Sequence, residues 1–191
     1  MPLVLTSGPA AEPVTVAEAK AYLRVDGNAE DALIASLILT SRLHIETALG
    51  IALMTQSWTL VLDDWPRRGA VEIPVQPVQS IQSVRVRDRA GNVTTSPETD
   101  YILDGTSVPP RLVPAQGGWP KPSRSIAGIE IALTAGYGGG PADVPGPIRQ
   151  ALLLLTAHWY EHRQPIEIGR PSTRIPDAIS DLLLPYRKVR L

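Results

Sequence analysis

The chain of 191 residues carries 18 Lys and Arg, 19 Asp and Glu and no cysteine, which gives a formal net charge of −1. This near-neutral charge excludes a global attraction to nucleic acid or to an anionic membrane, so any such contact must be local. The lack of cysteine excludes disulfides, thiol nucleophiles and thiolate metal sites. The length fits one domain with a sizeable core. No segment reaches the roughly 18 consecutive apolar residues of a membrane span, so we expect a soluble protein without a membrane partner.

The first regular element is a short helix that begins after Thr15. Thr15 is followed three residues later by Glu18, which is the pattern of a capping box. Asn28 then has the side chain of a good helix N-cap, and Gly50 is a typical stop signal. These two residues bound a long helix over about 29–49.

The long helix has one clearly apolar face. Apolar residues recur along it at spacings of three, four and seven, as expected for a helix with one buried side: Ile34, Leu37, Ile38, Ile45, Ala48 and Leu49. Leu33, Leu39 and Leu43 lie off this face. More than one side of the helix therefore needs to be covered.

The middle of the chain, residues 56–135, is predicted to be rich in β-strands. Apolar and polar residues alternate in it with the period of two that indicates half-buried strands. The predicted strands are 56–62, 83–88, 101–103 and 128–136, and residues 90–92 form a hairpin turn between two of them.

Residues 109–125 are rich in Pro and Gly and are predicted to form a long exposed loop. Long loops inside compact proteins are often functional. Trp119 lies in this loop, and it either folds back on its own sheet or anchors an interface, where Trp is enriched.

A second strong helix is predicted over about 147–163. Asp143 or a neighbouring residue caps it, and Pro147 suits its first turn. A final short helix follows Pro176 and stops at Pro185.

These elements predict the α+β class. The terminal segments form a helical core, in which the helix at about 29–49 packs on the helix at about 147–163, and residues 56–135 form an inserted β-rich wing. We expect a single domain over residues 1–191, with residues 185–191 as a C-terminal docking tail.

His158, Glu161 and His162 match the H-x-x-E-H pattern of one class of zinc peptidases. Imidazoles at i and i+4 share a helix face and can hold one zinc, with the Glu as general base. A catalytic zinc needs a third protein ligand, and no His follows. A zinc-dependent hydrolase is therefore an alternative, and the main interpretation assigns no catalytic residue, metal ligand or cofactor.

The tail places three cations among apolar residues beyond the last helix, and its residues are Tyr186, Arg187, Lys188, Val189, Arg190 and Leu191. It is either a solubilising tail or a segment that docks on an acidic groove or on phosphates. Arg85, Arg87 and Arg89 alternate outward on a predicted strand, where they can face an acidic neighbour. A DNA-binding module that acts through this strand and the tail is a further alternative.

Several stretches, taken in order, resemble a known family: residues 14–53, Thr134–Gly138, residues 144–163 and residues 175–187. Their signature parts include AEAK followed by LRV, TAGYG, and IRQA leading to HWY. The chain is similar in these parts to the head-tail connector, or adaptor, proteins of long-tailed phages and of phage-like gene transfer agents.

The resemblance implies a structural protein without enzymatic activity that forms a twelve-subunit ring between the portal and the stopper or tail proteins. The ring extends the DNA channel at the head-tail junction of the particle, and DNA passes through its lumen without sequence-specific binding. The family's C-terminal segment reaches the portal, which implies a portal-binding role for residues 186–191. Trp119, Arg85, Arg87 and Arg89 are candidates for contact with the next subunit or the stopper.

Overall fold

The structure, a computed structural model, describes residues 2–162 and 176–187. The chain folds into two compact units. Unit 1 comprises residues 1–10 and 50–137, and unit 2 comprises residues 11–49 and 138–191. The described residues form four α-helices and two antiparallel sheets, so the predicted α+β class is confirmed.

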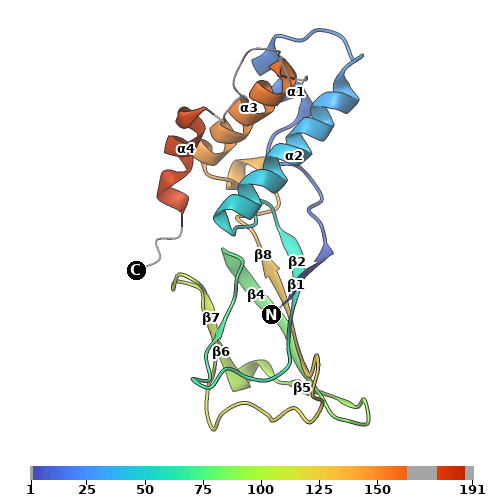
Figure 1. The fold of residues 1–191 in the computed structure, drawn as a ribbon, viewed down its shortest axis with the longest axis vertical. Coiled ribbons are helices and arrows are strands. Elements are labelled where there is room, and N and C mark those ends of the chain that lie inside the picture. Colours follow the sequence, from blue (N-terminus) through green and yellow to red (C-terminus); the bar gives the residue numbers. More distant parts are fainter. Residues whose placement is uncertain (1, 163–175, 188–191) are drawn as a thin grey trace, which may run out of the picture. The chain divides into compact units, whose positions relative to one another are not determined.

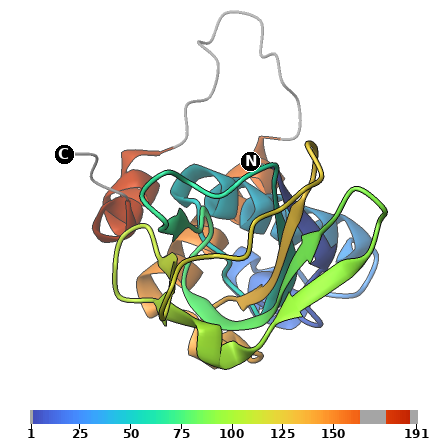
Figure 2. The same ribbon diagram turned by 90° about the horizontal axis from the view of Figure 1, so that it is seen from below.

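Unit 1 is built on a five-stranded antiparallel sheet in the order β1-β2-β8-β4-β5 (Figure 1). Its strands are β1 Leu3–Ser7, β2 Gln56–Leu62, β4 Val78–Arg87, β5 Val93–Ser96 and β8 Ile129–Ala135. The β4–β5 hairpin forms one edge of this sheet (Figure 2). The predicted strands at 56–62, 83–88 and 128–136 therefore exist, whereas β1 was not predicted.

Apolar residues at every second position of the strands explain which face of the sheet is buried. Leu60 lies opposite Ile131 across β2 and β8, and both side chains are fully buried. Gly136 ends β8 with φ +133°, and a Cβ at this position would lie 2.2 Å from the Met54 carbonyl oxygen. Only glycine fits where the chain leaves the sheet.

A second, three-stranded sheet in unit 1 has the order β3-β7-β6. Its strands are β3 Val71–Glu72, β6 Tyr101–Asp104 and β7 Arg111–Pro114. The prediction that residues 109–125 form one continuous loop is therefore wrong, because β7 lies inside it. Leu112, the second residue of β7, is fully buried and supplies the burial that stabilises so short a strand.

Unit 2 contains the helices α1 Val16–Leu23, α2 Asp31–Leu49, α3 Gly146–Glu161 and α4 Asp177–Leu183. The capping box of α1 is present as predicted: the Glu18 amide donates to Thr15 Oγ1 at 3.1 Å, and the Thr15 amide donates to Glu18 Oε2 at 2.8 Å. The bond from the Thr15 amide is the largest cause of a lowered pKa of Glu18. A hydrogen bond from Thr15 Oγ1 to Glu18 Oε2 at 2.9 Å and the charge and hydrogen bond of Arg149 lower this pKa further, against the opposing effect of burial.

Two predicted caps are wrong. The helix α2 begins at Asp31, and Asn28 lies in the turn before it, where its carbonyl accepts from the Asp31 amide at 3.3 Å. Asp143 closes a short 3-10 turn, Pro141–Asp143, by accepting from the Gly140 amide at 2.8 Å. The helix α3 starts only after this turn, with Pro147 in its first turn.

Helices α2 and α3 lie side by side within unit 2 (Figure 1). Ser41 Oγ and Thr156 Oγ1 form a buried hydrogen bond of 3.0 Å between them. The rings of His44 and Trp159 meet edge to face with centroids 5.7 Å apart.

The buried face of α2 also holds charge. The Arg42 guanidinium contacts Glu12 Oε2 and Glu46 Oε2, each at 2.7 Å. Arg42 and Glu46 are 5% and 8% exposed. Burial alone lowers the pKa of Arg42, but the hydrogen bonds and charges of Glu12 and Glu46 outweigh it and raise the pKa. The segment before α1 is thereby tied to the middle of α2.

By length and composition α2 is long and apolar enough to cross a membrane, contrary to the expectation from sequence that no segment would be. Seven of its residues are nevertheless buried inside the structure, among them Arg42 and Glu46. Two charged side chains that are paired inside unit 2 are typical of a core helix rather than of a membrane span.

Candidate functional site

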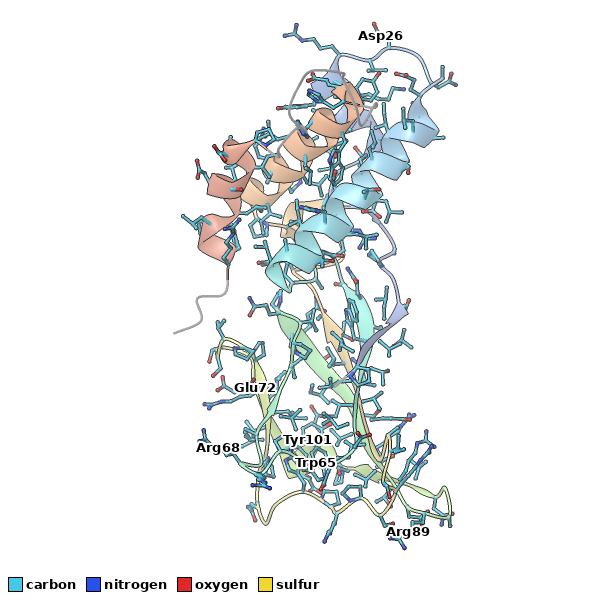
Figure 3. The ribbon with its side chains drawn as sticks, viewed as in Figure 1. Asp26, Trp65, Arg68, Glu72, Arg89 and Tyr101 are labelled. Atoms are coloured by element: carbon cyan, nitrogen blue, oxygen red, sulfur yellow. The ribbon has the colours of Figure 1, made fainter. Side chains whose placement is uncertain are left out.

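Unit 1 carries a cluster of cations at the end of the five-stranded sheet where β2 and β4 stop and β8 begins. We call this region the basic loop end; it consists of residues 63–70, 85–92 and 115–128. Six of its cations are exposed and form no ion pair with another residue that the structure describes: Arg67, Arg68, Arg85, Arg89, Lys121 and Arg124. Arg68 and Arg89 lie at the periphery of unit 1 in Figure 3.

Aromatic side chains hold the loops of this region together. The rings of Trp65 and Trp119 stack with centroids 4.2 Å apart and an interplanar angle of 6°. Trp65 Nε1 donates to the Pro120 carbonyl at 2.7 Å, and Trp119 Nε1 donates to the Gly69 carbonyl at 2.6 Å. Tyr101 extends the stack from β6 (Figure 3). The loops are thus joined by reciprocal indole hydrogen bonds.

The carboxylates of the basic loop end bind backbone amides instead of the cations. Asp63 Oδ1 accepts from the Ala127 amide at 2.8 Å, and Asp64 Oδ1 accepts from the amide of Trp65 at 2.8 Å. Asp88 accepts from the side chain and the backbone of Asn92, and these bonds lower the pKa of Asp88, the side-chain bond being the largest cause. The cations therefore remain available to an acidic partner.

The predicted row of three arginines divides into three environments. Arg85 is exposed on β4. Arg87 forms a bidentate pair with Glu130 of β8 at 3.1 and 3.0 Å. Arg89 lies beyond the end of β4, where its Nε donates to the Ser123 carbonyl at 3.1 Å. The prediction that all three alternate outward on one strand is therefore wrong for Arg89.

Only the beginning of the predicted docking tail lies within the described residues. Helix α4 buries Ile179 and Leu183, and a 3-10 turn, Leu184–Tyr186, follows it. Arg187 is exposed, while residues 188–191 lie outside the described part of the chain.

His158, Glu161 and His162 lie at the C-terminal end of α3. The two imidazole rings are 4.7 Å apart, and burial followed by the charge of His162 lowers the pKa of His158, against the opposite effect of Glu161. Within residues 2–162 and 176–187, no group of three or more His, Asp or Glu side chains is placed to hold a metal ion. The geometry gives the zinc-hydrolase alternative no third ligand there.

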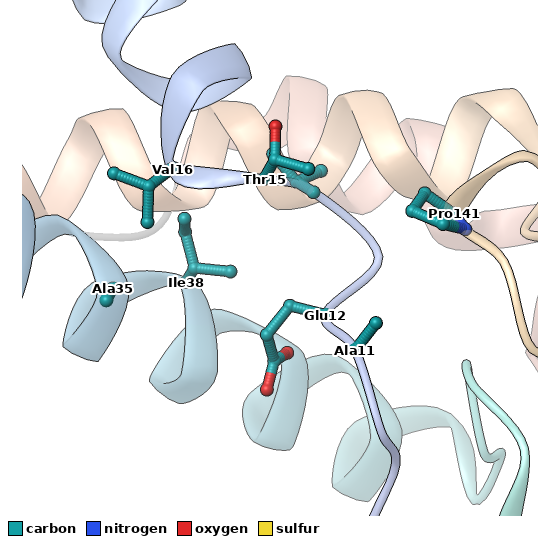
Figure 4. A pocket seen from close by; sticks show the side chains of 8 residues that line it. Ala11, Glu12, Thr15, Val16, Ala35, Ile38 and Pro141 are labelled. Carbon is teal, nitrogen blue, oxygen red and sulfur yellow. The ribbon is translucent and has the colours of Figure 1, made fainter.

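A small cavity of about 170 Å³ lies within unit 2 (Figure 4). It is bordered by Ala35 and Ile38 of α2, by Pro141 and by residues 11, 12 and 14–16. Its walls are mainly apolar, and it is smaller than the roughly 300 Å³ at which ligand pockets begin. It has room for one apolar side chain.

Sequence reasoning found Trp119 and part of the arginine row but missed Trp65, Arg67, Arg68, Lys121 and Arg124. These five residues belong to short stretches rich in Pro and Gly that carry no periodic pattern. The only sequence signal was the recurrence of a Trp-Pro dipeptide followed closely by cations at Trp65 and again at Trp119.

The chain is similar to proteins of known particles. The phage gp6-like head-tail connector family matches residues 13–101. A chain in the neck of an empty gene transfer agent particle, computed with C6 symmetry, is 27% identical, with a TM-score of 0.86 over 100% of this chain and 97% of that chain. No curated protein sequence matches the chain.

Two further structures agree. A chain in the neck of a native gene transfer agent particle, computed with C12 symmetry, is 26% identical with a TM-score of 0.84. A chain in the virion of a native gene transfer agent particle is 26% identical with a TM-score of 0.83. Both matches cover 100% of this chain and 97% of the other chain. The matched family and structures are structural proteins rather than enzymes, and the chain is similar to head-tail connector proteins.

Proposed function

We propose that the chain forms a closed ring of twelve copies in the neck of a phage or gene transfer particle, between the portal and the stopper or tail proteins. DNA passes through the lumen of this ring without sequence-specific binding. The observation that carries the proposal is the match over 100% of the chain to a neck structure with a TM-score of 0.86. During assembly the protein resides in the host cytoplasm.

The charge distribution supports this role. The net charge of −1 gives the chain no general attraction to DNA, as a channel through which DNA slides requires. Six of the exposed cations that form no ion pair with another described residue lie instead at the basic loop end, where they suit contact with an acidic surface of the next subunit or of the stopper. Arg85 and Arg89 make this contact directly, and Arg87 and Trp119 support it through Glu130 and the Trp65 stack.

Native mass spectrometry of the purified chain, alone and mixed with the portal ring of the same particle, tests the ring. We expect a portal complex with about twelve added copies, consistent with closed cyclic symmetry. A folded chain that ignores a folded portal would contradict the proposed function.

Residues 186–191 form the segment that docks on the portal. The exposed Arg187 and the two following cations in the sequence suit an acidic groove. Deleting residues 186–191 should abolish portal attachment while the unfolding temperature stays unchanged, because α4 ends before the deletion. A variant that keeps the length but replaces Arg187, Lys188 and Arg190 by Gln separates the effect of charge from that of the apolar residues. Normal incorporation of the truncated chain into particles would contradict the docking role.

A further inference from the structure

Two of the three charged side chains of helix α2 lie on its buried side. The helix contains three charged residues, and Arg42 and Glu46 are both buried while Asp31 stands at the first position. The ten exposed positions of α2, which we call the uncharged face, hold no Lys, Arg, Asp or Glu: Ala32, Leu33, Ala35, Ser36, Leu39, Thr40, Leu43, His44, Thr47 and Ala48.

The large apolar side chains of this face are substantially exposed. Leu33, Leu39 and Leu43 are 37%, 41% and 47% exposed. Leu39 and Leu43 stand one turn apart on the same side of the helix. A solvent-facing helix surface normally carries charged and polar residues opposite its core face, and the uncharged face departs from this pattern.

We infer that the uncharged face of α2 is the surface on which the next copy of this chain packs in the ring. This inference rests on the proposed function and adds the location of the contact. The similar neck structures were computed with C6 and C12 symmetry. In a closed ring every subunit has a neighbouring copy, so each exposed α2 has one copy that can cover it. A permanent contact between identical subunits is also the class of interface that is most apolar.

The size of the face fits a subunit contact. The 19 residues of α2 span about 28 Å at a rise of about 1.5 Å per residue. The apolar cavity beside Ala35 (Figure 4) adds a socket for one apolar side chain at the edge of the same face. Because the contacts of a cyclic ring are head-to-tail, the side chains that cover α2 come from a different surface of the neighbour.

The lack of cysteine allows a direct test. Leu43→Cys supplies a single thiol for a benzophenone label, and irradiation of the complex assembled with portal should yield a product with the mass of two copies of this chain. The control is Val108→Cys in unit 1, where an apolar side chain is 65% exposed; its label should give much less of this product. Crosslinks from position 43 to portal alone, or no crosslink in a complex that contains the chain, would overturn the inference.

A second variant measures assembly itself. The double substitution Leu39→Lys and Leu43→Lys should abolish the portal complex with about twelve added copies in native mass spectra. The unfolding temperature of the monomer should change little, because both positions are exposed. Val108→Lys is the matched control and should assemble like the original chain. Normal assembly of the double variant would overturn the inference. Failure of the original chain to assemble would instead contradict the proposed function, and the inference with it.

Discussion

The uncharged face of α2 and the basic loop end of unit 1 distribute charge in opposite ways. In α2, Arg42 and Glu46 are paired inside the unit and the exposed positions are uncharged. At the basic loop end, the carboxylates bind backbone amides and six cations remain exposed without ion pairs to the described residues. The first surface suits a permanent apolar contact, and the second suits a contact that salt can weaken.

The largest expected effect comes from breaking the buried charges of α2. Arg42→Ala removes the guanidinium that pairs with Glu12 and Glu46, and removing one member of a buried pair costs about 3–5 kcal/mol. The free energy of unfolding, from denaturant titration, should fall by this amount. Arg67→Ala, which removes an exposed cation, should stay within about 0.5 kcal/mol. A loss below about 1 kcal/mol for Arg42→Ala would show that these charges do not stabilise unit 2.

The aromatic stack tests whether the basic loop end is held in place before a partner binds. Trp119→Ala removes the stacking on Trp65 and the hydrogen bond to Gly69, and should cost about 2–3 kcal/mol, less than the roughly 3–5 kcal/mol of a fully buried aromatic. Trp119→Phe keeps a ring that can stack on Trp65 but loses part of the stacked surface and the hydrogen bond, and the bond alone is worth about 1 kcal/mol. Equal losses in the two variants would contradict a structural role of the stack.

Salt should affect binding through the basic loop end and binding through the uncharged face of α2 differently. Raising the ionic strength from about 0.1 M to about 1 M shortens the Debye length from about 10 Å to about 3 Å. Binding of the stopper through the basic loop end should therefore weaken, whereas the α2 contact between subunits should persist. The double variant Arg67→Glu and Arg68→Glu should lower the association rate with the stopper by about tenfold or more at low salt and less at high salt. Surface plasmon resonance measures this rate.

An association rate that does not change with salt would contradict the assignment of the basic loop end. Duplex DNA serves as the second analyte in the same measurement. Binding of the original chain to DNA rather than to the stopper near physiological salt would favour the nucleic-acid alternative for this surface.

The smallest effect concerns Asp104 in unit 1. Its carboxylate accepts hydrogen bonds from Ser107, Thr106 and Arg111, and these lower its pKa well below the ordinary value of 3.8, the Ser107 bond being the largest cause. A lowered pKa in the folded state stabilises the protein above pH 3.8, and this contribution is lost as the pH falls below that value toward the folded pKa. Asp104→Asn should remove this part of the pH dependence of the unfolding temperature. Carboxyl NMR titration of Asp104 with a midpoint at or above 3.8 would contradict the assignment.

Local signals predicted much of the fold. The pair Thr15 and Glu18 identified a capping box that is present in the structure, and alternation located β2 and β8. The strand β1 was missed because LVLTS lacks alternation, and it forms only by pairing with β2 more than fifty residues later. The strand β7 was missed because Pro110 precedes it and Pro114 is its last residue, and because it needs its partners β3 and β6.

The distribution of charge on α2 was not predictable from the helix alone. Arg42 and Glu46 at i and i+4 resemble an exposed ion pair in sequence. Their burial depends on Glu12, thirty residues upstream, which reaches Arg42 from the segment before α1. Leu39 and Leu43 are exposed because the helix turns the side that carries Arg42 and Glu46 toward the core. The sequence did predict that another part of the protein must cover these two leucines.

If identical copies form a neck ring through the uncharged face of α2, the neighbouring copy hides this face from solvent in the assembled particle. Electron cryomicroscopy of the chain assembled on its portal tests it most directly. We expect a closed ring of about twelve copies in which Leu39 and Leu43 of every subunit are covered by the neighbouring copy. A ring in which the uncharged face of α2 points to solvent, or copies bound to portal without contact to one another, would contradict it.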